Sequence, residues 1–123
     1  MTRLDHLAIF VSDARRSRDW YMKHLGLKLE FEVTNPKAAA LQDDAGFTLF
    51  VGERPNDAVS PSCVLYFQVD DVDSKYRELT DNGVKFDKAP QRLFWGYGAE
   101  LLDPDGYRIG LWDEHSMREK GGS

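Results

Sequence analysis

One histidine and one short aromatic run are the residues of this sequence whose types and spacing could support chemistry. His6 lies in an apolar stretch near the start of the chain. An imidazole there could hydrogen-bond or transfer a proton, because histidine titrates near neutral pH. It could equally be a strand histidine satisfied by backbone groups or water. No other residue can be named as its chemical partner, so the sequence alone favours no catalytic role for His6.

The aromatic run lies in the second half of the chain, where Trp95 and Tyr97 flank Gly96. Such rings can form the wall or lid of a ligand site, and the glycine leaves the backbone unusual freedom. They can equally pack in a core or an interface, as most aromatic side chains do. The sequence contains no Cys-x-x-Cys pair, phosphate-binding loop or dinucleotide-binding glycine fingerprint.

Composition and charge exclude several classes of function. The chain has 123 residues, 41% hydrophobic and 30% charged, as in ordinary globular domains. Its net charge of −5 argues against non-specific nucleic-acid binding and modestly favours cationic ligands. No apolar run is long enough to span a membrane. The one cysteine, Cys63, cannot form an internal disulfide, and no signal peptide is evident, so we expect a cytoplasmic protein.

The elements that must position these residues occur twice along the chain. Three blocks recur in the same order, at offsets of 57 to 60 residues. They are residues 7–13 with 65–71, residues 26–29 with 83–86, and residues 41–47 with 101–107. We therefore divide the chain into two modules, 1–53 and 62–113, joined by a linker at 54–61. The polar residues 114–123 are expected to form a flexible tail.

Each module is predicted to contain a strand, a helix and three further strands. Residues 4–11 form an apolar, β-branched run of strand length. The expected helix caps are Ser12 or Asp13 and Asp70 or Asp71, and the expected helix stops are Gly26 and Gly83. The remaining strands are expected at 27–33, 38–42, 47–52, 84–86, 97–102 and 107–112. The pattern predicts an α+β fold with the order β-α-β-β-β, twice.

This pattern resembles the vicinal oxygen chelate superfamily, which includes glyoxalase I, extradiol dioxygenases, and fosfomycin and bleomycin resistance proteins. The segments that carry the resemblance are residues 4–13, Trp20-Tyr21 with Leu25-Gly26-Leu27, residues 69–73, Trp95-Gly96, and Asp103-Pro104-Asp105-Gly106. It implies the glyoxalase/bleomycin resistance fold, in which each module curls its sheet into half a cup. It also implies that two halves close over a ligand cavity and that the protein is a homodimer.

The resemblance further implies four metal-binding positions, two on the first strands of the modules and two on the last strands. The internal repeat places His6 and Val64 at the first pair, and Phe50 and Gly110 at the second pair. Only His6 offers a donor, whereas catalytic zinc takes at least three protein ligands. The resemblance therefore implies a family member with most of its metal ligands replaced.

No nearby carboxylate is expected to restore the metal site, because Glu53 has the wrong strand parity and Glu100 lies on another strand. We thus expect no cofactor, and the resemblance places His6 in the cavity. Tyr66 and Trp112 share the cavity face with Val64 and Gly110 by strand parity. The expected ligand-binding residues are His6, Phe50, Tyr66, Trp95, Tyr97 and Trp112.

Three hypotheses of function follow. The preferred one is a metal-free protein that binds a small molecule in an aromatic-lined cup, similar to the bleomycin resistance branch and not an enzyme. The alternative is a metal-dependent lyase or dioxygenase of the same superfamily, with His6 as a ligand of a divalent metal. The third is a catalytically silent module whose partner is a second copy of itself. Neither nucleic acid nor a membrane is expected as a partner.

Overall fold

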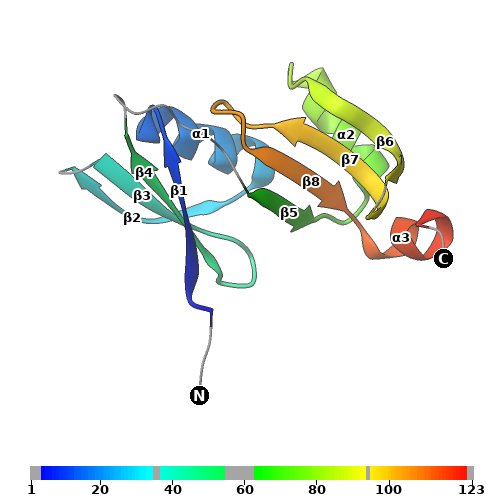
Figure 1. Ribbon diagram of the computed structural model, residues 1–123, viewed down its shortest axis with the longest axis horizontal. Helices are drawn as coiled ribbons and strands as arrows, with labels where there is room; N and C mark the ends of the chain where they lie inside the picture. The colour runs from blue at the N-terminus through cyan, green and yellow to red at the C-terminus, as the bar shows by residue number, and fades with distance from the viewer. Residues whose placement is uncertain (1–3, 35–36, 55–62, 94, 122–123) are drawn as a thin grey trace. The chain divides into compact units, whose positions relative to one another are not determined.

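The chain forms two compact units in a computed structural model that describes residues 4–34, 37–54, 63–93 and 95–121. The units are Met1–Ser60 and Pro61–Ser123, and each is built around its own four-stranded sheet (Figure 1). Of the expected linker at 54–61, only Arg54 belongs to the described residues. No helix in the described part of the chain is long and apolar enough to cross a membrane.

The first unit has the order strand, helix and three strands. Its elements are β1 (His6–Val11), α1 (Ala14–Leu25), β2 (Lys28–Thr34), β3 (Lys37–Gln42) and β4 (Thr48–Glu53). The strand order across the sheet is β1-β4-β3-β2, with β1 parallel to β4 and the other neighbours antiparallel.

The second unit repeats this order and adds a third helix. Its elements are β5 (Val64–Gln68), α2 (Val72–Asp81), β6 (Phe86–Leu93), β7 (Gly96–Leu102), β8 (Arg108–Trp112) and α3 (Glu114–Lys120). The strand order is β5-β8-β7-β6, again with the first pair parallel and the others antiparallel. The predicted α+β fold with β-α-β-β-β order is confirmed.

The two sheets also share one pairing register. Ala8 of β1 lies opposite Phe50 of β4, and Tyr66 of β5 lies opposite Gly110 of β8. The members of the two pairs are related by offsets of 58 and 60 residues, which are the offsets of the sequence blocks. The repeat noticed in the sequence is therefore a repeat of strand pairing.

The helices begin where a carboxylate caps the backbone. Asp13 accepts a hydrogen bond of 3.0 Å from the N–H of Arg16, and Asp71 accepts one of 3.2 Å from the N–H of Ser74. Of the alternatives that the sequence left open, Asp13 and Asp71 are the caps. α1 ends at Gly26, whose φ of +70° is a left-handed conformation that favours glycine.

A second carboxylate ties the start of each helix to the last strand of its sheet. Glu53 Oε1 accepts a 2.9 Å hydrogen bond from the N–H of Ala14 in the first unit. Asp113 Oδ2 accepts a 2.7 Å hydrogen bond from the N–H of Val72 in the second unit. Asp113 is also the N-cap of α3, where its Oδ1 accepts from the N–H of Ser116 at 2.6 Å.

The apolar core of each unit lies between its helix and one face of its sheet. The fully buried core side chains include Ile9, Tyr21, Leu41 and Val51 in the first unit, and Val72, Leu79, Leu101, Ile109 and Leu111 in the second. Because strand side chains alternate, the residues between them point to the other face of each sheet. We call these surfaces the face opposite α1 and the face opposite α2, and they carry most of the candidate site residues.

Two expectations from the sequence need correction. Residues 114–120 are not a flexible tail but helix α3, which packs against β7 and begins at the cap Asp113. β6 runs from Phe86 to Leu93, well beyond the expected residues 84–86. It is an edge strand, so it tolerates polar residues and Pro90, and its sequence therefore lacks a strand signal.

Candidate functional site

Three neighbouring strands bring a tyrosine, a glycine and a glutamate into one row on the face opposite α2. Tyr66 of β5 is paired with Gly110 of β8, and Gly110 is paired with Glu100 of β7. Directly paired residues project from the same face of a sheet. The side chains of Tyr66 and Glu100 therefore flank a position that has no side chain of its own.

The indole of Trp95, in the turn between β6 and β7, lies over this gap. A Cβ atom on Gly98 would lie 2.3 Å from Cη2 of the indole, and one on Gly110 would lie 3.6 Å from Cζ2. The rings of Trp95 and Tyr66 meet edge to face, with centroids 5.3 Å apart and an interplanar angle of 76°. Gly98 and Gly110 thus form a platform on which the indole rests.

Glu100 anchors this indole from the same side. Trp95 Nε1 donates a hydrogen bond of 2.8 Å to Glu100 Oε2, and Arg108 Nη1 donates one of 2.9 Å to Oε1. Lys88 Nζ lies 3.9 Å from Oε1. Glu100 is only 4% exposed, and a buried carboxylate is tolerated when charged partners and hydrogen bonds compensate it, as these do.

Arg108 links Glu100 to a second carboxylate at the edge of the sheet. Arg108 Nη1 also donates a 2.7 Å hydrogen bond to Asp87 Oδ2. The bond to Asp87 and the bond to Glu100 raise the pKa of the guanidinium, although partial burial lowers it. The hydrogen bond from Arg108 likewise lowers the pKa of Asp87. Trp95, Glu100, Arg108 and Asp87 therefore form one connected polar chain beside the aromatic pair.

The face opposite α1 in the first unit carries a second aromatic group. Phe50 lies between His6 and Phe31, with ring centroids 6.4 Å and 6.2 Å away. His6 Nδ1 lies 3.1 Å from Asp5 Oδ2 in an exposed position. Phe31 is 48% exposed, so this group presents ring surface outward.

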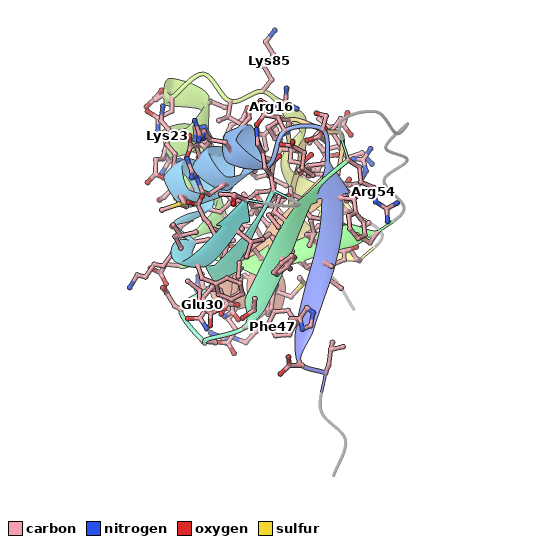
Figure 2. The ribbon with its side chains drawn as sticks, turned by 90° about the vertical axis from the view of Figure 1, so that its left-hand side faces the viewer. Arg16, Lys23, Glu30, Phe47, Arg54 and Lys85 are labelled. Atoms are coloured by element: carbon pink, nitrogen blue, oxygen red, sulfur yellow. The ribbon has the colours of Figure 1, made fainter. Side chains whose placement is uncertain are left out.

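A cation–π contact lies on the same face, at the end of β1 and β4 where Phe10 and Arg54 meet. The guanidinium of Arg54, which follows β4 as Figure 2 shows, lies 4.0 Å from the centroid of the Phe10 ring. The ring of Phe10 in turn covers Gly52, where an added Cβ would lie 3.2 Å from it. Figure 2 also labels Phe47, which precedes β4 at its other end. The aromatic surface of the first unit is thus bounded by a cation–π contact.

Four of the expected ligand-binding residues form two ring pairs, one within each unit. Tyr66 and Trp95 are in contact, and His6 and Phe50 share one face of the first sheet. Trp112, paired with Gln68, projects from the face opposite α2 by strand parity.

Tyr97 projects to the other side of its sheet. Its hydroxyl donates a 3.0 Å hydrogen bond to Asp73 of α2, and Lys120 Nζ lies 4.9 Å from its ring centroid. Burial and the hydrogen bond to Asp73 raise the pKa of Tyr97. Tyr97 alternates with Gly98 along β7, so strand parity places its side chain on the α2 side of the sheet, whereas Trp95 lies in the turn before the strand.

Glu100 is not among the expected ligand-binding residues, although the sequence carries a signal for its position. The turn at Asp103 closes with a backbone hydrogen bond from its N–H to the carbonyl of Tyr107. Counting outward from that turn places Glu100 opposite Gly110. Phe31 was missed for a different reason, since a bulge after Leu29 shifts the register of β2.

The residues at the four expected metal positions do not fit a divalent cation. Phe50 and Val64 have no donor atoms, and a Cβ on Gly110 would lie 2.6 Å from Cδ1 of Tyr66. Of the two carboxylates considered as replacements, Glu53 accepts a hydrogen bond from the N–H of Ala14, and Glu100 accepts hydrogen bonds from Trp95 and Arg108. Among the described residues, no three His, Cys, Asp or Glu side chains gather to hold a metal ion.

Comparison with known proteins gives one family and many similar structures. Residues 3–111 match the model of the Glyoxalase/Bleomycin resistance protein/Dioxygenase superfamily. A superfamily member from Sphaerobacter thermophilus is 24% identical with a TM-score of 0.76, over 93% of this chain and 98% of that chain. A possible glyoxalase from Bacillus cereus is 21% identical with a TM-score of 0.74, over 90% and 98%.

An antibiotic binding protein from Streptomyces sp. CB03234 is also similar, at 24% identity and a TM-score of 0.73, over 92% of this chain and 96% of that chain. At these levels of identity, the similar structures establish the fold alone. No match was found among curated proteins.

Proposed function

The chain belongs to the glyoxalase/bleomycin resistance protein/dioxygenase superfamily, and we propose that it binds a small planar aromatic molecule without a metal. The observation that carries this proposal is the Tyr66–Trp95 pair over Gly110. It occupies the space that a metal-binding side chain would need at that position. Because this position offers aromatic rings and no metal-binding atoms, the ligand would be recognised by stacking and apolar contact.

The exposure of the rings supports a binding role. Tyr66 is 48% exposed even though its edge contacts Trp95, so a ligand can reach it. His6 and Phe50 form a second ring pair in the first unit, with centroids 6.4 Å apart. One similar protein is named for binding an antibiotic, and many antibiotics carry planar ring systems, so this class of ligand is a reasonable one to test. The net charge of −5 modestly favours a cationic ligand.

A homodimer is part of the proposal. Phe10, Phe31 and Val33 project from the face opposite α1 and are 40%, 48% and 42% exposed. Apolar side chains gathered on one face are typical of interaction sites. A second copy of the chain is the proposed partner, and analytical ultracentrifugation would detect it as a doubling of mass.

A fluorescence titration tests the binding function. The probes are ethidium, a planar aromatic cation, and an anilinonaphthalene sulfonate, an apolar anion. We expect ethidium to quench tryptophan fluorescence saturably in the wild-type protein and to bind Tyr66→Ala at least about tenfold more weakly, as loss of an aromatic contact predicts. Tyr97→Phe is the matched control, because Tyr97 lies on the other side of the sheet. Equal affinity of all three proteins would contradict the proposed site.

The rival function is a metal-dependent lyase or dioxygenase that uses His6. It requires donors other than the residues at the four expected positions, because only His6 among them has a donor atom. The carboxylate that lies against His6 is that of Asp5. Stoichiometric zinc, nickel, iron or manganese that is lost in His6→Ala would support this rival. A protein that dimerises but binds no probe would instead support the role of a partner module.

A further inference from the structure

We propose that Glu100 is a positioning residue that fixes the Trp95 indole in its binding orientation. This inference rests on the proposed function, because it concerns how the aromatic pair is prepared for a ligand. Glu100 itself is 4% exposed and meets the indole at its nitrogen, so it acts through Trp95 and not by touching the ligand.

The first support is that both oxygens of Glu100 have assigned donors. Oε2 accepts from Trp95 and Oε1 accepts from Arg108. Hydrogen bonds to an ionised acceptor are shorter and stronger than neutral ones. Arg108 is itself held by Asp87, so the carboxylate cannot turn without breaking a second charged contact. The direction of the Trp95 N–H is therefore fixed from the sheet side.

The second support is the shape of the platform. Trp95 lies in a turn, and its ring occupies the space that a Cβ of Gly98 would need and lies 3.6 Å from where a Cβ of Gly110 would be. Gly96, which follows it, has a φ of +132°, and a Cβ there would lie 2.3 Å from the sulfur of Met117. A flat surface limits how far the indole can approach but not how it rotates. The hydrogen bond to Glu100 supplies that missing constraint.

The arrangement has a consequence for the class of ligand. Because the indole N–H of Trp95 is engaged by Glu100, a ligand at this site meets ring surface and not a hydrogen-bond donor of the indole. The site therefore selects ligands by the area and planarity of their rings. A carbonyl or other acceptor placed to meet the indole nitrogen would bring no gain in affinity.

Variants of Glu100 distinguish a role in orienting the Trp95 indole from a role in the stability of the fold alone. The indole N–H signals of ¹⁵N-tryptophan-labelled protein are assigned with Trp20→Phe, Trp95→Phe and Trp112→Phe, and hydrogen exchange is measured for each. In wild type, we expect the Trp95 N–H to exchange slowly. In Glu100→Ala it should exchange at least about tenfold faster, and ethidium should bind about tenfold more weakly.

Glu100→Gln retains an acceptor oxygen and should restore slow exchange, with affinity within about threefold of wild type. Glu78→Gln, on the exposed surface of α2 in the same unit, changes the charge equally and should alter neither readout. A structural role alone would lower the melting temperature of both Glu100 variants without the selective rescue by Gln.

If Glu100→Ala does not fold, the double-mutant cycle of Trp95→Phe with Glu100→Leu replaces it, because leucine fills the site but offers no acceptor to the indole. Coupling of the two changes in ethidium affinity supports the inference, and additivity overturns it. Unchanged exchange of the Trp95 N–H in Glu100→Ala also overturns it. If no probe binds wild type, the proposed function fails, while the exchange measurement still decides whether Glu100 holds the indole.

Discussion

The indole nitrogen of Trp95 donates a 2.8 Å hydrogen bond to the buried carboxylate of Glu100, across a platform of two glycines. This single contact joins the aromatic surface of the second unit to the charges of Arg108 and Asp87. Because it holds the Trp95 indole, Glu100 belongs to the candidate site although its own side chain is buried. In the proposed function, a ligand would meet the rings of Tyr66 and Trp95 held in this orientation.

The two glycines of the platform should respond differently to substitution. A Cβ on Gly98 would lie 2.2 Å from the carbonyl oxygen of Leu111, a backbone atom that cannot move aside. We expect Gly98→Ala to lower the free energy of unfolding by about 1–3 kcal/mol or more. Urea denaturation followed by circular dichroism measures this change.

Gly110→Ala should change stability less, because its new methyl group meets the half-exposed ring of Tyr66, which can swing away. The displaced Tyr66 ring would lose its contact with Trp95. Ethidium affinity should therefore drop while the urea midpoint stays close to wild type. A larger loss of stability in Gly110→Ala than in Gly98→Ala would contradict the platform geometry.

The equivalent carboxylates Glu53 and Asp113 should contribute unequally to stability. Glu53 accepts one hydrogen bond from the start of α1, whereas Asp113 accepts one from the start of α2 and also caps α3. We expect Glu53→Ala to cost about 1 kcal/mol and Asp113→Ala about 2 kcal/mol or more. Equal losses in denaturant titrations would mean that one of the Asp113 bonds adds nothing.

Asp113 also makes the stability depend on pH. Burial raises the pKa of Asp113, but the hydrogen bonds from Ser116 and Val72 outweigh it and leave the pKa below its ordinary value. The stabilisation is therefore fully present above the unfolded pKa of about 3.9 and is lost as pH falls through the lower folded value. Asp113→Asn should flatten the acid limb of a stability profile measured in urea, and an unchanged limb would assign it to other carboxylates.

The hydroxyl of Tyr97 should matter for stability and not for binding. Its hydrogen bond to Asp73 joins β7 to α2 on the face away from Trp95. Tyr97→Phe is expected to cost about 1 kcal/mol of unfolding free energy, the usual contribution of one hydrogen bond. Calorimetry measures that loss, and a weaker Kd for ethidium in the same variant would place Tyr97 in the ligand site.

The sequence allowed the pairing of the strands to be predicted better than the contacts between side chains. Residues 7–13 and 65–71 repeat because both precede a capped helix, and their offset carries through to the pairing of Tyr66 with Gly110. The turn at Asp103 fixed the β7–β8 register and so could have revealed Glu100.

Other features depend on contacts that no local pattern encodes. Trp95 meets Tyr66 from a turn after an edge strand, so neither periodicity nor parity predicts their contact. Helix α3 is short and polar, and its packing depends on Met117 lying against Gly96. Propensity alone could not separate this helix from a flexible tail.

Metal-free binding of a planar aromatic ligand is the function proposed for this family member. The decisive measurement is the Kd of ethidium for EDTA-treated protein, measured again after addition of zinc, nickel, iron or manganese. We predict the same Kd in every sample, because His6 alone among the four expected metal positions offers a donor. Binding that appears only with a metal, and disappears in His6→Ala, would contradict the account.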